Sequence, residues 1–273
     1  MNDAKQPEHF ETHGWMIVDL PDAGIVAGVR DRLLDHLRRT SLPGLERLED
    51  YHTRIDSDGR HVEVLFDLSQ FYWKEQLATP LIAGHLDFFQ AFIAPDLAVQ
   101  KYPYLRAVRP GSSRDAVFMH RDTYYGSSPY EIAVFIPFVD LPAESALRVV
   151  SGSHAEPDSA YPWTRASSNG VTSGSPKHQL GFPYAPKTLD PAVVERAEAV
   201  PLAFGQAMLF SLSLVHGGGT NAGDATRFST DIRVVNAFAP IEWSHSVHPD
   251  YYLPLSDSLV TRMAKRYFAA NDS

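Results

Sequence analysis

A histidine and an aspartate separated by one residue, His120 and Asp122, stand at the edge of an apolar stretch in the segment MHRDTYYG. In an extended strand, residues two apart point to the same face, so both side chains can aim inward while Arg121 points away. One imidazole and one carboxylate on one face form half of a facial triad, the arrangement that holds Fe(II) and leaves coordination positions open. A second histidine would complete such a site.

The letters HRD also occur in the catalytic loop of protein kinases, where an asparagine five residues after the aspartate holds a magnesium ion. That position is Ser127 in this chain. The sequence also has no glycine-rich phosphate loop and no DFG motif. These departures argue against a kinase.

His216 is the candidate for the second histidine. It ends the run GQAMLFSLSLVH, whose alternation is typical of a strand, and the three glycines that follow let the chain turn sharply. Eleven residues later comes a second strand-like run, TRFSTDIRVV. Its period of two places four polar residues on one face: Arg227, Ser229, Asp231 and Arg233. So polar a face in a core strand requires an anionic ligand or a dense network of ion pairs.

The elements that must position these residues differ along the chain. Apolar residues before about residue 94 recur with helical spacing, and we expect one helix after Asp22 and another from Thr79-Pro80. From about 97 to 240, short runs rich in β-branched and aromatic residues alternate with glycine, proline, serine and asparagine. This texture is typical of an antiparallel sandwich or barrel.

We expect a single domain over residues 1–273, because no internal repeat and no linker divides the chain. Its parts are N-terminal helices at about 22–94, a β core at about 97–240 and a C-terminal helix at about 256–268. The segment at about 156–190 is rich in proline, glycine and serine and has no clear period. We expect it to be a long insertion over one mouth of the core, above the active site.

The composition limits the class of partner. A formal net charge of −9 argues against a nucleic acid, because phosphate binding needs a basic surface. The absence of cysteine excludes thiolate ligands, so a metal must be held by histidines and carboxylates. No stretch reaches the roughly 18 apolar residues that a membrane span requires. The first residues do not have the pattern of a secretion signal, so a cytoplasmic location is expected, while the oligomeric state stays unknown.

Three segments together resemble a known family. HRD at 120–122, VHGGGTN at 215–221 and TRFS at 226–229 are similar to the signature of Fe(II)/2-oxoglutarate-dependent dioxygenases, in the branch related to phytanoyl-CoA dioxygenase. That branch has HxD on an early core strand, a histidine in an HGSGxN-like turn and an arginine eleven residues after it. The segment SALRVVSGSHAEP also resembles the family's PGSH segment, with Ser151 in place of the proline. The resemblance covers roughly Trp15 to Pro240.

The resemblance implies a mainly β fold, a double-stranded β-helix (a cupin-like jelly roll) with flanking α-helices. It implies that the catalytic centre is Fe(II) held by His120, Asp122 and His216, with 2-oxoglutarate and O2 as co-substrates. It further implies that Arg227, with Ser229, binds the distal carboxylate of 2-oxoglutarate, since a guanidinium pairs bidentately with a carboxylate. Arg233 has three open roles: replacing Arg227, contacting the substrate, or pairing with Asp231.

The substrate is expected to be a small polar molecule. Candidate contacts combine aromatic faces with hydrogen-bonding groups, which suits a sugar or another polyol. They are Tyr104, Arg106, Tyr124, Tyr125 and Trp163. Tyrosines near strand ends can also simply seal a barrel. The segments HRDTYYG and TRFSTDIR are similar to segments of dioxygenases from sugar and aminoglycoside antibiotic pathways. This resemblance implies hydroxylation or oxidative closure of a ring or orthoester.

Two other functions use the same residues. A cupin-like binding protein would keep the fold without turnover, but it would not need an iron site together with an anchor for an oxo acid. A zinc hydrolase would need a general base near the metal-bound water. Glu131 and Glu144 are the only carboxylates nearby in sequence, and neither has a recognisable motif. The oxygenase is therefore the leading prediction.

Overall fold

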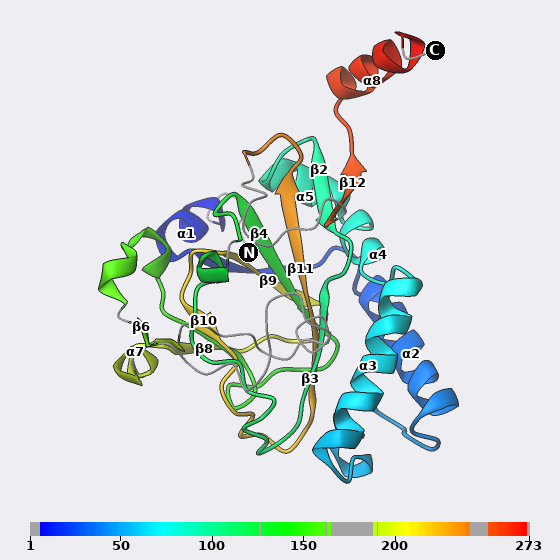
Figure 1. Ribbon diagram of the computed structural model, residues 1–273, viewed down its shortest axis with the longest axis vertical. Helices are drawn as coiled ribbons and strands as arrows, with labels where there is room; N and C mark the ends of the chain where they lie inside the picture. The colour runs from blue at the N-terminus through cyan, green and yellow to red at the C-terminus, as the bar shows by residue number, and fades with distance from the viewer. Residues whose placement is uncertain are drawn as a thin grey trace.

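The structure of the 273-residue chain is a computed structural model that describes residues 6–125, 127–161, 163–164, 188–189, 191–240 and 251–271. Its centre is a seven-stranded antiparallel sheet with the strand order β1-β9-β4-β11-β2-β12, in which β3 also pairs with β11 (Figure 1). The strands are β1 (Trp15–Asp19), β2 (Leu97–Gln100), β3 (Tyr104–Val108), β4 (Glu131–Pro137), β9 (Gln206–Ser211), β11 (Arg227–Asn236) and β12 (Tyr252–Ser256).

A smaller sheet lies on one side of the large one, and the long helices lie on the other (Figure 1). The smaller sheet has the strand order β10-β5-β8. Its strands are β10 (His216–Gly217), β5 (Leu147–Val149) and β8 (Glu198–Val200). A two-stranded ladder joins β6 (Trp163–Thr164) to β7 (Thr188–Leu189). The expectation of a mainly antiparallel fold with flanking helices is confirmed.

The helices are α1 (Gln6–His13), α2 (Ala23–Thr40), α3 (Asp58–Lys74), α4 (Thr79–Ala83), α5 (Leu86–Phe92), α7 (Pro191–Glu195) and α8 (Leu259–Asn271). Short 3₁₀ turns are η2 (Leu48–Arg54), η3 (Asp122–Tyr125), η4 (Ser153–Ala155) and η5 (Asp158–Ala160). Helix α2 begins as expected, because the Asp22 carboxylate accepts a hydrogen bond from the Gly24 amide at 2.8 Å.

The helix predicted from Thr79-Pro80 is two helices, α4 and α5, separated at Gly84 and His85, and its N-cap is Ala78. At Gly84 a Cβ atom would lie 2.2 Å from the end of the Ile25 side chain in α2 and 2.9 Å from the Pro80 carbonyl oxygen, so any larger residue would require these neighbours to shift. Helix α3 was not predicted; its buried positions follow helical spacing within a stretch rich in aromatic and β-branched residues. Strand β12 was not predicted either, and it precedes a C-terminal helix that begins at Leu259.

Strand β11 is the centre of the large sheet, and its two faces differ. One face packs under the helices: Phe228 lies edge-on to Tyr51, and the Tyr72 hydroxyl donates a hydrogen bond to Thr230 Oγ1 at 2.8 Å. Ile232 and Val234 are buried in the same hydrophobic core. The opposite face carries the four polar residues expected from the period of two, and all four are buried.

Most of the expected insertion at 156–190 lies outside the described residues, which cover 156–161, 163–164 and 188–189 of it, with the elements η5, β6 and β7. The single-domain organisation stays a prediction. Within the part of the chain that the structure describes, no helix combines the length and the apolar character needed to span a membrane.

A buried polar cluster ties α3 to the segment after β3. The Tyr51 hydroxyl lies 3.0 Å from His61 Nδ1, and Asp115 lies beyond His61 in an ion pair with Arg109. Burial lowers the pKa of His61 from 6.5 to about 4, although the Asp115 carboxylate opposes this shift. The folded protein therefore holds His61 in its neutral form.

Because the pKa of His61 is lower in the folded than in the unfolded chain, its contribution to stability is complete above pH 6.5 and is lost as the pH falls toward 4. Between about pH 7.5 and about pH 5 we expect this residue to account for a loss of about 2 kcal/mol. Urea unfolding of the wild type and of His61→Gln at both pH values measures it. The variant should lose less stability on acidification, and an equal loss in both proteins would contradict this assignment.

Candidate metal centre

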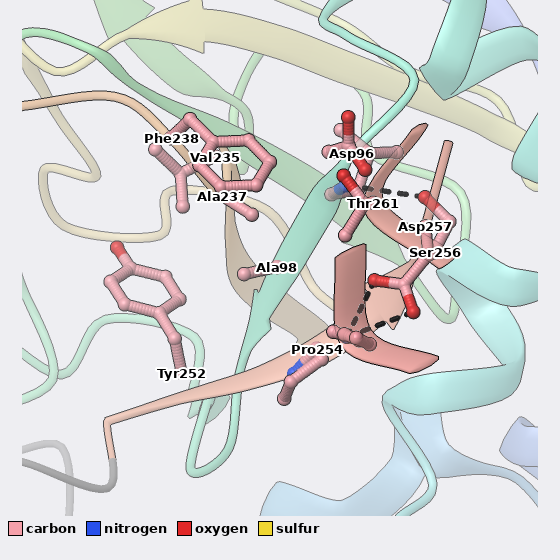
Figure 2. Close-up of a pocket in the computed structure, with 12 residues that line it drawn as sticks. Asp96, Ala98, Val235, Ala237, Phe238, Tyr252, Pro254, Ser256, Asp257 and Thr261 are labelled. Atoms are coloured by element: carbon pink, nitrogen blue, oxygen red, sulfur yellow. Dashed lines mark hydrogen bonds and ion pairs between the residues drawn. The ribbon is translucent and has the colours of Figure 1, made fainter. Parts of the chain in front are cut away.

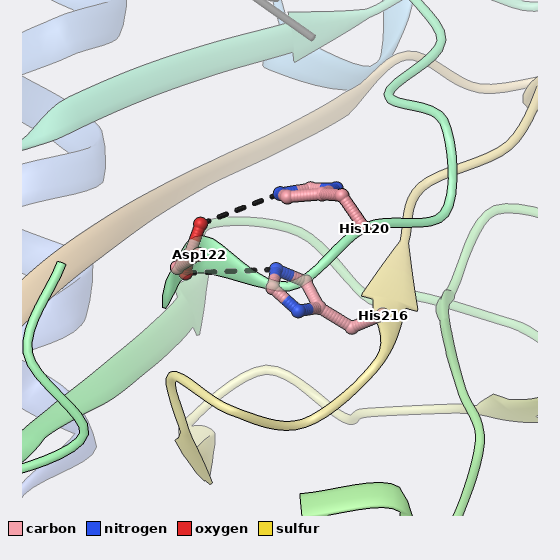
Figure 3. Close-up of side chains that lie close together, drawn as sticks. All are labelled: His120, Asp122 and His216. Atoms are coloured by element: carbon pink, nitrogen blue, oxygen red, sulfur yellow. Dashed lines mark ion pairs between the residues drawn. The ribbon is translucent and has the colours of Figure 1, made fainter. Parts of the chain in front are cut away.

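His120, Asp122 and His216 converge in the interior of the protein, with their side chains pointing toward one another (Figure 3). Asp122 Oδ1 lies 3.3 Å from His120 Nε2, and Asp122 Oδ2 lies 3.8 Å from His216 Nε2. One ligand atom from each residue lies within 4.8 Å of the other two. A metal about 2 Å from each donor would set neighbouring donors about 3 Å apart, so small side-chain movements adapt this group to an ion.

Both histidines are held in the same way. His120 Nδ1 donates a hydrogen bond to the carbonyl of Phe118 at 2.7 Å, and His216 Nδ1 donates to the carbonyl of Leu214 at 3.0 Å. Because a carbonyl can only accept, Nδ1 carries the proton and Nε2 is the basic nitrogen that turns toward Asp122. Burial lowers the pKa of His216 to about 3, so this imidazole stays neutral, as a metal ligand must.

The backbone around the ligands corrects one expectation. His120 and Asp122 do not lie on a regular strand: His120 forms an isolated bridge with His216, and Asp122 begins the turn η3. The bridge consists of two backbone hydrogen bonds of 2.8 and 2.9 Å that link His120 with His216 directly. Strand alternation therefore predicted that these two side chains lie on one side, but the backbone that places them there is not a regular strand.

Arg121 was expected to point away from the interior, yet it is buried. Its guanidinium pairs with Asp158, donates to the Ser153 and Glu156 carbonyls at 2.6 and 2.9 Å, and stacks over the ring of Tyr161. Arg121 therefore attaches the loop that contains the two candidate ligands to the 3₁₀ turns that follow β5. No role was predicted for Arg121 from the sequence, although its position between two candidate ligands was a signal.

The segment SGSH, which resembles a family motif, positions His216 through its backbone. Ser153 Oγ accepts a hydrogen bond from the Val215 amide at 2.8 Å. The Val150 amide donates to the Val215 carbonyl at 2.9 Å, which sets β10 beside β5. Ser153 therefore supports the residue immediately before the ligand.

Each of the three positions after His216 favours glycine for a different structural reason. A Cβ on Gly217 would lie 2.9 Å from the backbone of Met119 and Val117, so only glycine lets the two ligand segments approach this closely. A Cβ on Gly218 would lie 2.7 Å from Arg227 Nη2. Gly219 has a φ of +55°, which glycine adopts most easily.

Arg233 pairs with two carboxylates. Its Nη2 lies 2.6 Å from Asp122 Oδ2 and its Nη1 lies 3.0 Å from Asp231 Oδ1. Burial alone would raise the pKa of Asp122, but the Arg233 guanidinium, with His216 and His120, holds it well below its ordinary value. On β4 the residue opposite Arg233 is the small Ala133. Asp122 is therefore ionised and oriented before any metal binds.

Arg227 differs from Arg233 in having donors to spare. Its Nη1 donates to the Ser145 carbonyl at 2.9 Å, whereas its Nε and Nη2 have no hydrogen-bond partner within the described residues. The Ser229 hydroxyl, two residues along the same face, also lacks one there. Burial lowers the pKa of Arg227 to about 10, and Arg106 acts in the same direction, yet the group stays charged. These buried donors fit an incoming carboxylate.

The residues expected to contact a substrate are placed unevenly. Tyr104 and Arg106 lie on β3 directly opposite Asp231 and Ser229, so they share the inner face of the sheet. Tyr124 packs against a small hydrophobic cluster that contains Met119. Tyr125 ends η3 and Trp163 lies in β6, and the side chains of these two residues are outside the described part of the structure.

Neither glutamate considered as a general base is suited to that role. Glu131 is buried, and its carboxylate accepts hydrogen bonds from the Ser128 amide and the Tyr252 hydroxyl. Glu144 is exposed at the surface. Within the described residues, no carboxylate other than Asp122 joins the histidine pair in the metal-binding group.

The sequence matches the model of the family described as Phytanoyl-CoA dioxygenase (PhyH) over residues 86–229, which is just over half of the chain. No curated protein matches it. The 2-oxoglutarate complex of EvdO2 from Micromonospora carbonacea var. aurantiaca is 20% identical and has a TM-score of 0.59, with 92% of this chain and 97% of that chain covered. The nickel complex of ThoJ, described as a non-heme monooxygenase, is 20% identical and has a TM-score of 0.54, with 93% and 85% covered. At this identity both likenesses show the fold.

The pair of Asp122 and Arg233 can be tested without a metal. Because removing one partner leaves a buried charge without its counterion, Asp122→Asn and Arg233→Met should each lower the free energy of unfolding, by about 3–5 kcal/mol for the arginine. The double variant should be clearly more stable than the sum of the two losses predicts. Urea unfolding of the four proteins in the presence of a chelator measures the coupling, and additive losses would show that the two residues do not interact.

Proposed function

The chain belongs to the phytanoyl-CoA dioxygenase (PhyH) family of Fe(II)- and 2-oxoglutarate-dependent dioxygenases, and we propose that it oxidises a C–H bond of a small polar secondary metabolite. His120, Asp122 and His216 would hold the iron, and Arg227 with Ser229 would hold the distal carboxylate of 2-oxoglutarate. We also propose that the two sheets form a double-stranded β-helix that encloses this site. The cytoplasmic location expected from the sequence also stays a prediction.

One observation carries the proposal more than any other. A buried group of two imidazoles and one carboxylate is accompanied by an arginine and a serine whose donors have no partner within the described residues. Buried polar groups are nearly always hydrogen-bonded, and those that are not call for an explanation such as a ligand. An iron ion accounts for the first group and an oxo-acid carboxylate accounts for the second. EvdO2, of similar fold, is described with bound 2-oxoglutarate.

The choice between the two arginines follows from their contacts. Arg233 already pairs through Nη2 with Asp122 and through Nη1 with Asp231. It therefore has no pair of neighbouring N–H donors left that could bind a further carboxylate. Arg227 is anchored by Nη1 to Ser145, while Nε and Nη2 form the edge of the guanidinium that suits a bidentate pair. We therefore assign the co-substrate to Arg227 and a positioning role to Arg233.

When bound, Fe(II) with 2-oxoglutarate and O2 supplies the oxidising chemistry, and the protein supplies orientation and protection from water. The backbone carbonyls of Phe118 and Leu214 keep both imidazoles in the tautomer that ligates through Nε2. Arg233 holds Asp122 Oδ2, which leaves Oδ1 as the carboxylate oxygen nearer to His120. The burial of His120, Asp122, His216 and Arg233 keeps bulk water away from these side chains.

For the substrate we propose a sugar or an aminoglycoside, with hydroxylation or oxidative closure of a ring or orthoester as the outcome. Tyr104 and Arg106 support this class, because they share the inner face of the sheet with the site. The Arg106 guanidinium lies over the Tyr104 ring at 5.2 Å from its centre, so an aromatic face and hydrogen-bond donors are combined beside the iron ligands.

The cofactor assignment predicts an optical signal. Anaerobic addition of Fe(II) and then 2-oxoglutarate to the apo-protein should produce the weak visible charge-transfer band of a chelated keto acid. His216→Ala should abolish the band, because one of three ligands is lost, whereas His61→Gln, a change at a buried histidine outside the site, should keep it. Iron binding without a band would refute the co-substrate and favour a cupin-like binding protein.

The anchor for the co-substrate predicts a graded loss of affinity. Arg227→Lys should weaken 2-oxoglutarate binding by about 10- to 100-fold, since a hydrogen bond to a charged group contributes about 1.5–3 kcal/mol. Gly218→Ala should act in the same direction with a smaller effect, because its Cβ would displace Arg227 Nη2.

Calorimetric titration with 2-oxoglutarate measures both losses, and titration with Ni(II) should show unchanged metal binding. Gly28→Ala is the matched control, because a Cβ there meets no atom within 4 Å. If Arg227→Lys binds 2-oxoglutarate like the wild type, the anchor lies elsewhere.

A further inference from the structure

Arg121 lies between two candidate iron ligands in sequence, and its side chain is buried in a polar cluster outside the group of ligands. It forms an ion pair with Asp158, whose own side chain is 66% exposed. Its Nη2 also donates to the carbonyls of Ser153 and Glu156 at 2.6 and 2.9 Å. Burying a guanidinium is unfavourable unless its donors are paired, so packing alone does not account for an arginine here.

Ser153 is the residue at which this cluster meets the other ligand segment. It is fully buried: its carbonyl accepts the hydrogen bond from Arg121, and its hydroxyl accepts one from the Val215 amide at 2.8 Å. Val215 directly precedes His216 in the chain. One residue therefore holds the segment HRD through its carbonyl and the segment before His216 through its hydroxyl, so it fixes the two segments relative to each other.

The backbone holds the segment HRD at its two ends. At one end lies the bridge between the two histidines, and at the other the Thr123 amide donates to the Leu212 carbonyl at 3.2 Å. Arg121 and Asp122 lie between these two points of attachment. Their orientation therefore depends on their side chains, which are held by this cluster and by Arg233.

Aromatic and charged side chains complete the cluster. Tyr161 is completely buried, and the Arg121 guanidinium lies over its ring at 4.7 Å from the centre. The Tyr161 hydroxyl donates to the Glu156 carboxylate, which also lies 3.6 Å from Arg196 Nη2. Because a guanidinium stacks on an aromatic face and donates in two directions at once, lysine would replace only part of the contacts of Arg121.

We propose that Arg121 is a positioning residue of the metal centre. It contributes no ligand atom, and it sets the affinity for the metal by holding the segment that bears His120 and Asp122 against Ser153. The inference rests on the proposed iron site and goes beyond it, because it makes metal affinity depend on a cluster that supplies none of the ligands. The pair with Asp158 contributes less than the buried contacts, because exposed ion pairs are weak.

The test is calorimetric titration of the full chain with Ni(II), with His216→Ala identifying the heat that belongs to the site. Arg121→Met keeps an unbranched apolar side chain and removes the charge and every donor. We expect it to raise the Ni(II) dissociation constant about 10- to 100-fold, the usual effect of losing a residue that orients a ligand. Arg121→Lys should give an intermediate value. Asp158→Asn should raise the constant no more than about fivefold.

Arg38→Met is the matched control. Arg38 also donates to two backbone carbonyls, those of Leu45 and Glu46 at 2.6 and 2.9 Å, and pairs with Asp35. These contacts lie in and after α2, on the helical side of the large sheet (Figure 1). This variant loses a similar set of contacts and should bind Ni(II) like the wild type.

A second control lies at a cavity of about 270 Å³ beside β2 and β12 (Figure 2). The residues that the structure describes around this cavity include none from the metal centre or from the cluster at Arg121. Phe238 lines the cavity and is 69% exposed. Phe238→Ala should therefore fold and leave the affinity for Ni(II) unchanged.

A second measurement separates positioning from a general loss of structure. Circular dichroism verifies that each variant is folded, and 2-oxoglutarate is then titrated into the Ni(II)-saturated protein. Because Arg227 keeps its contacts, the dissociation constant for 2-oxoglutarate should change less than about threefold in Arg121→Met. Loss of both affinities to the same extent would indicate a structural role and overturn the proposal.

Equal Ni(II) affinity in the wild type and in a folded Arg121→Met would also overturn the proposal, as would an equal loss in Arg38→Met. If Arg121→Met does not fold, Arg121→Lys decides the question, and wild-type affinity in that variant counts against the proposal. A wild type without Ni(II) binding at His216 would refute the metal centre itself and this inference with it. Ni(II) binding without 2-oxoglutarate binding would refute only the co-substrate, and the effect of Arg121→Met on metal affinity would still decide this inference.

Discussion

The burial of four polar residues on one face of the central strand β11 is the constraint on which the rest of the structure depends. Burying a charge without a partner is very unfavourable, so each of these residues must be matched by another element. Arg233 is matched by Asp122 and Asp231, and Arg227 by the carbonyl of Ser145. Donors on Arg227 and Ser229 are left without a partner among the described residues, and it is to these that we assign the carboxylate of the proposed co-substrate.

The positions of the candidate metal ligands depend on backbone contacts more than on side-chain packing. The bridge between His120 and His216 brings two distant segments together, and Gly217 allows their close approach. Ser153 and Arg121 then connect these segments to the turns after β5. A substitution at any of these three supporting positions would move one of the candidate ligands without replacing its side chain.

The sequence identified the residues of the candidate site more completely than the elements around them. The spacing of HxD, the glycine turn and the arginine eleven residues after His216 predicted the residues that the structure brings together. Arg121 was misjudged, because strand alternation was applied to a segment that is an isolated bridge followed by a 3₁₀ turn. Arg233 was left open, because its pairing with Asp122 joins elements that are far apart in sequence and follows no periodic pattern.

The order of the site residues along the chain determines when the candidate site can form during synthesis. His120 and Asp122 leave the ribosome about 100 residues before His216 and Arg233, which at about 5–20 residues per second corresponds to on the order of 5–20 s. During this interval the nascent chain has only half of a metal site and cannot retain iron. The candidate ligand set is therefore complete only after His216 has been synthesised, and Arg233 then pairs with Asp122 Oδ2 and keeps this carboxylate ionised whether or not a metal is bound.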